Sequence, residues 1–424
     1  MPDFRAMFAS PDFNVSEGFF PNINLQEKLN WAEKFIQNVL IPRLPEAVAA
    51  HFPVELGTVL VMFALAGIFV AVVPLLPLVL VLAERKVAAR FQNRTGPMRV
   101  GPWGTLQTLA DGIKLIFKED FIPPQGDRLL FLLAPYVIFA CSFAVFAAIP
   151  FGDGIPIPGD FNIGIFYIMA ISSVIVMGVI MAGWSSNSKW SLLGSLRSAA
   201  QIVSYEIPLG LSILTVVMLV ESLSMTEIVA SQSNGVFSWL IFRTPFTFIA
   251  FFIFFISAIA EVNRTPFDLP EAESEIVAGF HTEYSGMRFA LFFIAEYANM
   301  FAVSAIAVTL FLGGWEGVLP GYDILGGFPG FVIKTLALVF LMMWLRWTLP
   351  RLRVDQLMNL CWKYFIPIAF FNILGTGIWG LIFPEDTLVS ITISCAIIYS
   401  GLIAAYAIAG RVMAQKPAPQ PSSV

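Results

Sequence analysis

Carboxylates are concentrated in one stretch of an otherwise apolar chain, from Ala260 to Phe301. Seven of the 29 Asp and Glu residues of the chain stand there within 36 positions. They are Glu261, Asp268, Glu271, Glu273, Glu275, Glu283 and Glu296. Burial disfavours the charged form of a carboxyl group and can raise its pKa by up to roughly 3 to 5 units. Such groups can hold and release protons near neutral pH, so the stretch predicts proton transfer or electrostatic coupling.

Three glutamates fall within or beside apolar segments: Glu206, Glu261 and Glu296. An ionised carboxylate at the centre of a bilayer costs about 2.5 to 3.5 kcal/mol, and such residues mark ion or proton paths. A hydrogen bond between helices, or a side chain reaching out from a helix end, would explain each one singly. Pro208 lacks the backbone N–H of a helical residue and frees the carbonyl of Ser204, which favours a water-filled cavity beside Glu206.

The depths of these glutamates predict where a path would run. At a rise of about 1.5 Å per residue, Glu296 lies about 12 Å from Arg288. Glu206 and Glu261 are expected near the inner ends of spans 203–221 and 241–261. Because the outer half offers only Lys334, we expect protons or charge to pass sideways to another chain.

The composition is that of an integral membrane protein. The chain is 58% hydrophobic and 12% charged, with a mean hydropathy of +0.80, whereas soluble domains are about 25% charged. Apolar runs of about 20 residues between polar turns predict an all-α polytopic fold. The expected spans are 57–83, 129–149, 163–184, 203–221, 241–261, 288–313, 328–348, 364–383 and 387–409.

The Lys and Arg residues predict the orientation. Eighteen of the 24 fall on one side of the predicted spans, and the connections 150–162, 222–240, 314–327 and 384–386 hold none. The positive-inside rule then places the amino terminus outside and the carboxyl terminus in the cytoplasm. The acidic stretch is expected on the inner side, where most of the Lys and Arg residues lie, so its negative charge is opposite to that of its surroundings.

Four regions are expected along the chain. An amino-terminal arm, 1–56, contains an amphipathic surface helix that carries apolar residues at helical spacing. An eight-helix core follows at 57–383, then an additional transmembrane helix at 384–410 and a cytoplasmic tail at 411–424. The apolar residues of the arm helix are Leu25, Leu29, Ala32, Ile36 and Leu40.

The connection from Glu84 to Arg128 forms a second group of polar residues. It predicts an interfacial helix, because one face is apolar and the opposite face carries Asp111, Lys114 and Lys118, with Trp103 at its entrance. A surface helix that binds anionic lipid fits the same pattern. Glu84 and Arg85 at the membrane edge would meet a polar headgroup or anchor the first span. The apolar face consists of Leu106, Leu109, Ile113 and Phe117.

Motifs for resident cofactors are missing from the sequence. Cys141, Cys361 and Cys395 fall in separate segments without a C-x-x-C motif, which speaks against iron–sulfur, zinc and disulfide sites. Nucleotide-binding glycine motifs are missing as well. If redox chemistry is involved, its cofactors are expected on other chains.

Four segments resemble the H-subunit family of bacterial NADH:quinone oxidoreductase, respiratory complex I, whose mitochondrial counterpart is the first encoded NADH dehydrogenase subunit. The segments are LAERKVAARFQNRTGPMRVGPWGTLQTLADGIKLIFKE, WSSNSKWSLLGSLRSAAQIVSYE, AEVNRTPFDLPEAESEIVAGFHTEYSGMRFALFFIAEYANM and WLRWTLPRLRVDQLMNLCWKYFIPI. The resemblance covers about 57–383 in consistent order, and NRTPFDLPEAESE is its most specific motif. The amino-terminal arm and the ninth span lie outside the eight-helix core of that family.

The resemblance implies a place at the heel of the membrane arm, in a quinone access chamber and the first acidic proton relay toward the antiporter-like subunits. Quinone would be the substrate, with FMN and iron–sulfur clusters on partner subunits and no catalysis by the isolated chain. Partners would be soluble quinone-site subunits, antiporter-like membrane subunits and lipid of the bacterial inner membrane, with no nucleic acid. The implied relay residues are Glu206, Glu261, Glu296, Asp268, Glu271, Glu273 and Glu283. The implied quinone-site residues are Arg85, Arg94, Asp111, Lys114, Phe293 and Arg346.

Three alternatives remain open at the level of sequence. Membrane-bound hydrogenases and dehydrogenases with other donors carry related subunits. A stand-alone proton-coupled transporter would also contain broken helices and buried glutamates, although few charges lie in the outer half and no inverted repeat is evident. A structural anchor would use the carboxylates for packing alone.

Overall fold

Helices make up the regular structure of the part of the chain that the computed structural model describes. That part comprises residues 60, 63, 64, 67, 70–152, 161–233, 235–270, 273–317, 326–383 and 392–401. Within it, six helical segments are long and apolar enough to cross a membrane, which confirms the all-α polytopic fold. They are Arg128–Ala148 (α7 and η4), Gly164–Ser185 (α8), Lys189–Val220 (α9), Gly286–Phe311 (α14), Gly327–Thr348 (α15) and Val354–Ile382.

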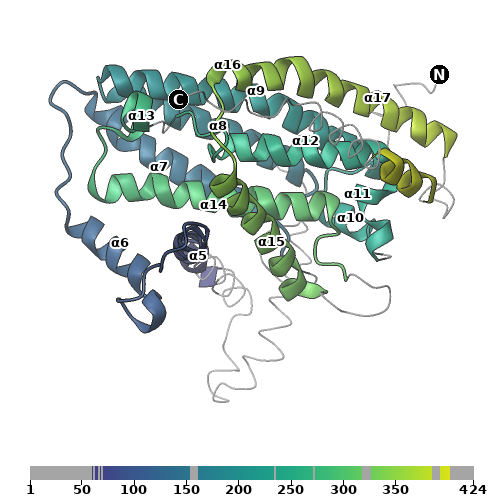
Figure 1. Cartoon of the computed structure of the whole chain (residues 1–424), viewed down its shortest axis with the longest axis horizontal. Helices are drawn as coiled ribbons and strands as arrows, with labels where there is room; N and C mark the ends of the chain where they lie inside the picture. The colour runs from purple at the N-terminus through teal and green to yellow at the C-terminus, as the bar shows by residue number, and fades with distance from the viewer. Residues whose placement is uncertain are drawn as a thin grey trace, which may run out of the picture.

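Shorter helices complete the bundle and its ends. Pro245–Glu261 (α12) is apolar and lies among the long helices, and α5 spans Leu75–Phe91. Figure 1 shows α7, α8, α9, α12, α14 and α17 running side by side, with α15 crossing them obliquely. At one end lie α6 (Gln107–Phe117) and α13 (Glu273–Ile276), and at the other α10 (Met225–Ala230) and α11 (Leu240–Arg243) (Figure 1).

The central helix is α14. Of its most apolar window, 72% is buried, against 28% to 50% for the other long segments. Alanines such as Ala302 and Ala305 let neighbouring backbones approach closely, as small residues do between membrane helices. At its far end Phe311 packs against Phe251 and Phe254 of α12, with ring centroids 5.5 and 5.6 Å apart.

The start of α12 is set by its own sequence. The hydroxyl of Thr244 accepts a hydrogen bond from the backbone N–H of Thr247, and that of Thr247 accepts one from the N–H of Thr244. Pro245 occupies the first helical position, where its missing N–H costs nothing. The preceding residues form the separate short helix α11, so the predicted start of this span at 241 was four residues early.

The predicted start of the fourth span at 203 was wrong. Helix α9 begins at Lys189, because the serines of its first turns are buried between helices rather than solvated in a loop. Ser191, Ser195 and Ser198 are fully buried. Glu206 therefore lies in the middle of a 32-residue helix and not at an inner helix end.

Two other predicted boundaries also differ from the structure. The first span, predicted to end at 83, continues as α5 to Phe91. The eighth, predicted from 364, begins with α16 (Val354–Asn359), passes through a π-helical turn, η7 (Leu360–Phe365), and continues as α17 (Ile366–Ile382). The helix Thr392–Gly401 falls inside the predicted ninth span. The predicted arm helix, the rest of the ninth span and the tail lie outside the described residues.

The break at Pro208 is satisfied by a side chain of the π-helical turn. The freed carbonyl of Ser204 accepts a hydrogen bond from Sγ of Cys361 at 3.0 Å, and the water-filled cavity expected beside Glu206 stays a prediction. In return, the hydroxyl of Tyr205 donates to the carbonyl of Leu357 at 2.9 Å. Both contacts join α9 to the region of the π-helical turn.

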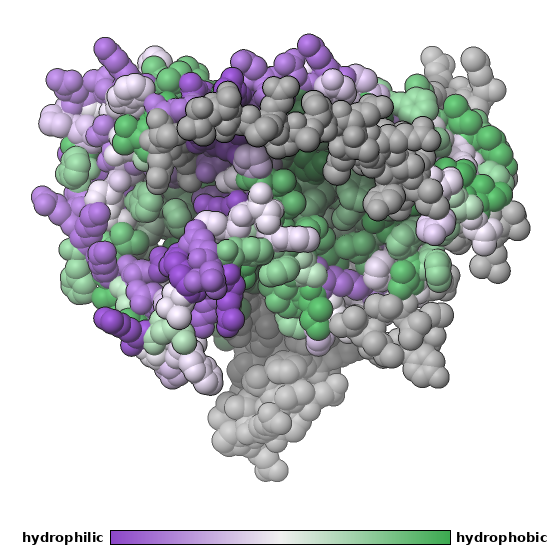
Figure 2. Space-filling view, in the orientation of Figure 1, coloured by the Kyte–Doolittle hydropathy of each residue, from purple (hydrophilic) through white to green (hydrophobic). Residues whose placement is uncertain are grey.

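The outer surface of the bundle is largely apolar. Figure 2 shows hydrophobic residues across the bundle and hydrophilic ones gathered toward the end that carries α6. The amphipathic helix α6 is confirmed, and its apolar face is exposed: Leu109, Ile113 and Phe117 are 54%, 49% and 84% accessible. An integral membrane protein requires such surfaces, because lipid covers them.

One cation is fixed at the end of the bundle opposite α6. Nζ of Lys334, on α15, donates to the carbonyls of Leu312, Gly314 and Glu316 at 3.0, 3.1 and 2.7 Å. It also lies 4.5 Å from the ring centre of Trp239. The ammonium group thereby satisfies carbonyls just beyond the end of α14.

Candidate functional site

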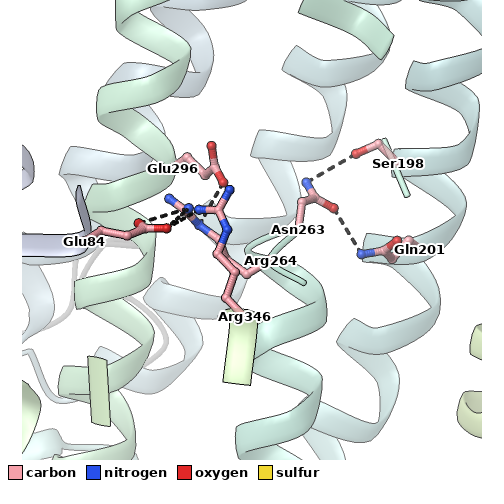
Figure 3. A network of polar contacts seen from close by, with 7 residues as sticks. All are labelled: Glu84, Ser198, Gln201, Asn263, Arg264, Glu296 and Arg346. Atoms are coloured by element: carbon pink, nitrogen blue, oxygen red, sulfur yellow. Dashed lines mark hydrogen bonds and ion pairs between the residues drawn. The ribbon is translucent and has the colours of Figure 1, made fainter. Parts of the chain in front are cut away.

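Two glutamates and two arginines from four elements meet in a buried cluster (Figure 3). Nη1 of Arg264 lies 3.3 Å from Oε2 of Glu84, and its Nε lies 2.9 Å from Oε1 of Glu296. Nη1 of Arg346 is paired with Oε1 of Glu84. Glu84 and Arg264 are only 4% and 3% exposed. We call these four residues the charge cluster, in which Arg264 is shared by two carboxylates.

An aromatic side chain completes the charge cluster. The guanidinium carbon of Arg264 lies 4.2 Å from the ring centre of Tyr297, and the Tyr297 hydroxyl is hydrogen-bonded to Glu84. Removing one member of a buried ion pair costs about 3 to 5 kcal/mol because the other charge stays desolvated. The cluster is balanced, with two negative and two positive groups, and it joins α5, the turn after α12, α14 and α15.

Helix α9 fixes the turn that carries Arg264. Nε2 of Gln201 donates to the carbonyls of Ala260 and Phe267 at 2.8 and 2.7 Å, and to Oδ1 of Asn263 at 3.2 Å. Asn263 has a left-handed φ of 55° and donates from Nδ2 to Oγ of Ser198 at 3.4 Å. Figure 3 shows this second network beside the charge cluster. The turn therefore leaves α12 in one defined direction.

Two small cavities lie beside Glu261, and the first of them joins it to Glu296. The first, about 50 Å³, is lined by Glu296, Glu261 and His281, and the second, about 40 Å³, by Glu261 and Ser172 among apolar residues. Asn299 borders both. A cavity needs a volume of roughly 10 to 15 Å³ to hold one water molecule, so each of these cavities has room for more than one water. Glu261, at the end of α12, stands where the two cavities meet.

Glu206 is reached through two adjacent serines of α8. The hydroxyl of Ser172 is hydrogen-bonded to Glu261, and that of Ser173 donates to Oε1 of Glu206. The structure thus brings the three predicted membrane glutamates into one series, Glu296, Glu261 and Glu206, across α14, α12 and α9.

Glu206 and Ser173 lie at the outer surface of α8 and α9. Glu206 is partly exposed, and its surroundings include Val203 and Ile207, which are 51% and 40% exposed on the same helix. Met177 of α8 is 62% exposed. A carboxyl group that faces hydrocarbon is unfavourable. This part of the surface, which we call the Glu206 face, is therefore polar at one point in an apolar setting.

Four of the six predicted quinone-site residues fall into two groups of contacts. Arg85 is ion-paired with Asp111, which also accepts a hydrogen bond from Nε2 of Gln107 at 3.1 Å, so α5 and α6 are joined. Arg346 belongs to the charge cluster, and Phe293 lies on α14 with its ring 5.6 Å from that of Tyr297.

The other two predicted quinone-site residues, Lys114 and Arg94, are exposed and belong to neither group of contacts. Arg94 donates to Oε1 of Gln92 at 2.7 Å and lines an open surface depression of about 800 Å³ with Lys86 and Arg90.

The described acidic residues of the loop lie outside the two cavities beside Glu261. Asp268 and Glu283 are partly buried and line neither cavity. Glu271 and the side chain of Glu273 lie outside the described residues, although the backbone of Glu273 opens α13. Glu275 is ion-paired with Arg197 at 2.9 Å and with Arg351 at 3.5 Å.

A neutral tyrosine ends this loop. Tyr284 stacks on Phe131, with ring centroids 4.1 Å apart, and its hydroxyl donates to the carbonyl of Phe131 at 3.3 Å. Burial raises the pKa of Tyr284 to about 12. The loop is therefore held to α7 by a residue that stays uncharged at neutral pH.

Sequence reasoning missed several residues of the site. Glu84 was expected at the membrane edge, Arg264 entered only the count of basic residues, and neither Tyr297 nor His281 was singled out. Glu84 had a usable signal, since it ends a long apolar run. Its pairing with Arg264 spans 180 positions, and no local spacing predicts a contact of that kind. Among the described residues, no group of three His, Cys, Asp or Glu side chains is arranged to hold a metal ion.

Comparisons with known proteins give one consistent result. The family model described as NADH dehydrogenase matches residues 63–377. The chain is 49% identical over 318 residues to the NADH-quinone oxidoreductase H subunit of Anaeromyxobacter dehalogenans, covering 70% of this chain and 77% of the relative. It is 51% identical over 315 residues to an H subunit of the same enzyme from Geobacter sulfurreducens, covering 70% and 88%. For the H subunit of Chlorobaculum tepidum the identity is 48% over 336 residues, covering 75% and 93%.

Proposed function

The chain belongs to the NADH dehydrogenase family, as an H-type membrane subunit of multi-subunit, proton-translocating NADH-quinone oxidoreductase, and from this premise we propose that it couples a quinone chamber to a lateral proton path. The observation that carries the proposal is Arg264, which Glu84 and Glu296 share. A cation with two carboxylate partners can move toward either one. That property suits a coupling element better than a static anchor.

In this proposal the quinone end of the path lies beside the middle of α5. Two arginines lie there. Arg346 is paired with Glu84, and Arg85, the next residue of α5, is paired with Asp111. Guanidinium groups donate hydrogen bonds to oxygen acceptors, so both arginines suit the carbonyl oxygens of a quinone headgroup. Phe293 of α14 supplies an aromatic surface beside Tyr297. Arg94 and Lys114 belong to the outer approach to this chamber.

Reduction of the quinone changes the charge that Arg346 experiences. Negative charge developing on the headgroup attracts Arg346 and weakens its hold on Glu84, which then takes a larger share of Arg264. Two unit charges 4 Å apart interact by ~4 kcal/mol at an effective dielectric of about 20. This equals roughly 3 pKa units, which is enough to let Glu296 take up a proton.

The proton then crosses the membrane-embedded glutamates. From Glu296 it passes through the first cavity to Glu261, and through Ser172 and Ser173 to Glu206. Within the acidic loop, Asp268, Glu271, Glu273 and Glu283 supply protons from the inner side. The basic side of the bundle faces the cytoplasm in this proposal, as the positive-inside rule predicts.

The Glu206 face is the exit of the path. A carboxyl group exposed to lipid is costly, so we assign this face to a neighbouring membrane subunit that brings a polar side chain to the same depth. Soluble partners cover the cytoplasmic end and carry the FMN and iron–sulfur clusters, while this chain holds none permanently. The 57–383 core performs these tasks, and the segments 1–56, 384–410 and 411–424 are accessory.

The test uses the complete complex in proteoliposomes. Glu296→Gln and Glu206→Gln each keep the size of the side chain but cannot take up or release a proton. Each should lower coupled quinone reduction by about 100-fold or more, from the low end of general acid–base effects upward. The matched control is Glu227→Gln, at an exposed position on α10, which should behave like wild type. If either membrane variant pumps protons at the wild-type ratio to electron flow, the relay assignment is wrong.

A further inference from the structure

His281 is a titratable residue at the centre of the site that the proposed relay does not yet use. It ends the short helix η6 (Gly279–His281) and is 8% exposed. Its ring centre lies 3.9 Å from that of Phe280, 5.0 Å from Phe292 and 5.7 Å from Phe289. The remaining side faces the 50 Å³ cavity that Glu261 and Glu296 also line.

The other groups around this cavity cannot carry charge. Helices α7, α8 and α9 contribute aliphatic side chains such as Ile138, Val179 and Ile202, and the polar remainder consists of the amides of Asn263 and Asn299. Amides donate and accept hydrogen bonds but do not titrate near neutral pH. The titratable groups among the described residues on its wall are therefore Glu261, Glu296 and His281, with Arg264 ion-paired to Glu296 behind it.

Imidazole has the chemistry that this position requires. One ring nitrogen accepts a proton while the other donates one, and the charge of histidine normally changes between pH 5 and 8. We propose that His281 carries the proton between Glu296 and Glu261. The O–H bond of protonated Glu296 breaks as an N–H bond forms on one ring nitrogen, the second ring nitrogen releases its proton to Glu261, and no electrons move. Water in the cavity bridges any remaining distance.

The backbone around His281 holds the ring at this place. Gly279 has a left-handed φ of 55°, and a Cβ at Gly194 of α9 would lie only 2.6 Å from its Cα, so η6 and α9 are in backbone contact. The hydroxyl of Ser191 donates to the carbonyl of Phe280 at 3.4 Å. The backbone N–H of Tyr284 donates to the carbonyl of His281 at 3.0 Å. The imidazole is thus positioned from α9 and from the loop that leads into α14.

This inference rests on the proposed relay, and its test separates the two. In the complete complex, His281→Gln retains polarity and His281→Phe retains an aromatic ring, but neither can be protonated. Both should lower coupled turnover by about 100-fold, the low end of general acid–base effects. His51→Gln, at the only other histidine of the chain, is the matched control and should keep the wild-type turnover. Should neither His281 variant assemble, His281→Asn provides the same test with a smaller amide.

Each outcome is decisive. A His281→Phe complex with the wild-type rate would show that the ring serves only for packing, and would overturn the inference. If His281 variants behave like wild type while Glu261→Gln and Glu296→Gln lose coupling, the relay stands without His281. If the glutamate variants also retain coupling, the proposed function itself fails.

Discussion

Two cations at opposite ends of the bundle, the buried Arg264 and the partly buried Lys334, are held in contrasting ways. At the α10 end, Lys334 donates to three backbone carbonyls at 2.7 to 3.1 Å. At the α6 end, Arg264 is paired with two carboxylates, Glu84 and Glu296, and a second cation competes for one of them. Both arrangements provide partners for the positive charge, but only the partners of Arg264 can change their protonation.

The difference lies in the partners. Backbone carbonyls neither titrate nor leave, so the surroundings of Lys334 are fixed and its contacts stabilise the connection after α14. Carboxylates gain and lose protons, and each one that does so redistributes Arg264 and Arg346. Positive charge thus serves as an anchor at one end and as a switch at the other, and substitutions at the two ends should fail in different ways.

The largest effect is expected for Arg264→Gln. This change removes the ion pairs that Arg264 makes with Glu84 and Glu296, at a cost of about 3 to 5 kcal/mol for a broken buried pair. Coupled turnover should be abolished, and part of the complex should fail to assemble. Quinone reduction by the purified complex and its subunit content measure both effects. Arg264→Lys, which keeps the charge but not the planar fork, should retain partial turnover. A fully active Arg264→Gln complex would remove the distinction between the two ends.

Lys334→Met should affect stability alone. It removes three charge-assisted hydrogen bonds, and leaving buried carbonyls unsatisfied costs about 1 to 3 kcal/mol. The purified complex should unfold at a lower temperature, while the complex that remains folded should turn over and pump protons normally. Loss of the proton-to-electron ratio in Lys334→Met would show that the fixed end also takes part in coupling.

Gln201→Ala tests whether the switch needs its support from α9. It leaves the carbonyls of Ala260 and Phe267 without their donor, and we expect a loss of about 1 to 2 kcal/mol together with a several-fold drop in coupled turnover. Gln201→Met has a similar size but lacks the Nε2 donor, so it should behave like the alanine variant. Wild-type coupling in both would mean that the turn after α12 holds Arg264 unaided.

The smallest effect is expected for Tyr284→Phe, a neutral position at the switch end. At pH 8 the variant loses one hydrogen bond and should be less stable by about 0.5 to 1.5 kcal/mol. The unfolded phenol ionises above pH 10, whereas burial raises the folded pKa to about 12. The contribution of this hydroxyl is thus fully present below pH 10 and is lost as the pH rises through about 12. Unfolding of both complexes across this range should show the difference vanish or reverse, and a constant difference would contradict the assignment.

The sequence was sufficient to predict the fold class and to single out the three membrane glutamates. Apolar runs predict membrane helices because the bilayer imposes their length and polarity. The same reasoning failed at residues 189–202, whose serines look solvated but pack between helices. Hydropathy measures the affinity of a segment for lipid, and a helix buried against other helices does not need that affinity.

The site was predictable only in part, for a related reason. Glu206, Glu261 and Glu296 stand out because an acidic residue in an apolar run is conspicuous by itself. Arg264 and Glu84 do not, because a basic or acidic residue next to a helix end is common and becomes significant only through a partner far along the chain. His281 gave no signal at all, since the cavity that it lines forms only when α7, α8, α9, α12 and α14 come together.

The contact between Cys361 and Ser204 has a further consequence for proton transport. Proline breaks in membrane helices commonly admit water to their free carbonyl, and a water there would sit two residues from Glu206. A thiol fills this position as a weak donor. The carbonyl that Pro208 leaves free is thereby satisfied within the protein, on the side of α9 that packs against the π-helical turn. The sulfur atom occupies the place where a water bound to this carbonyl would stand, and the hydrogen bond of Glu206 is made on the other side, to Ser173 of α8.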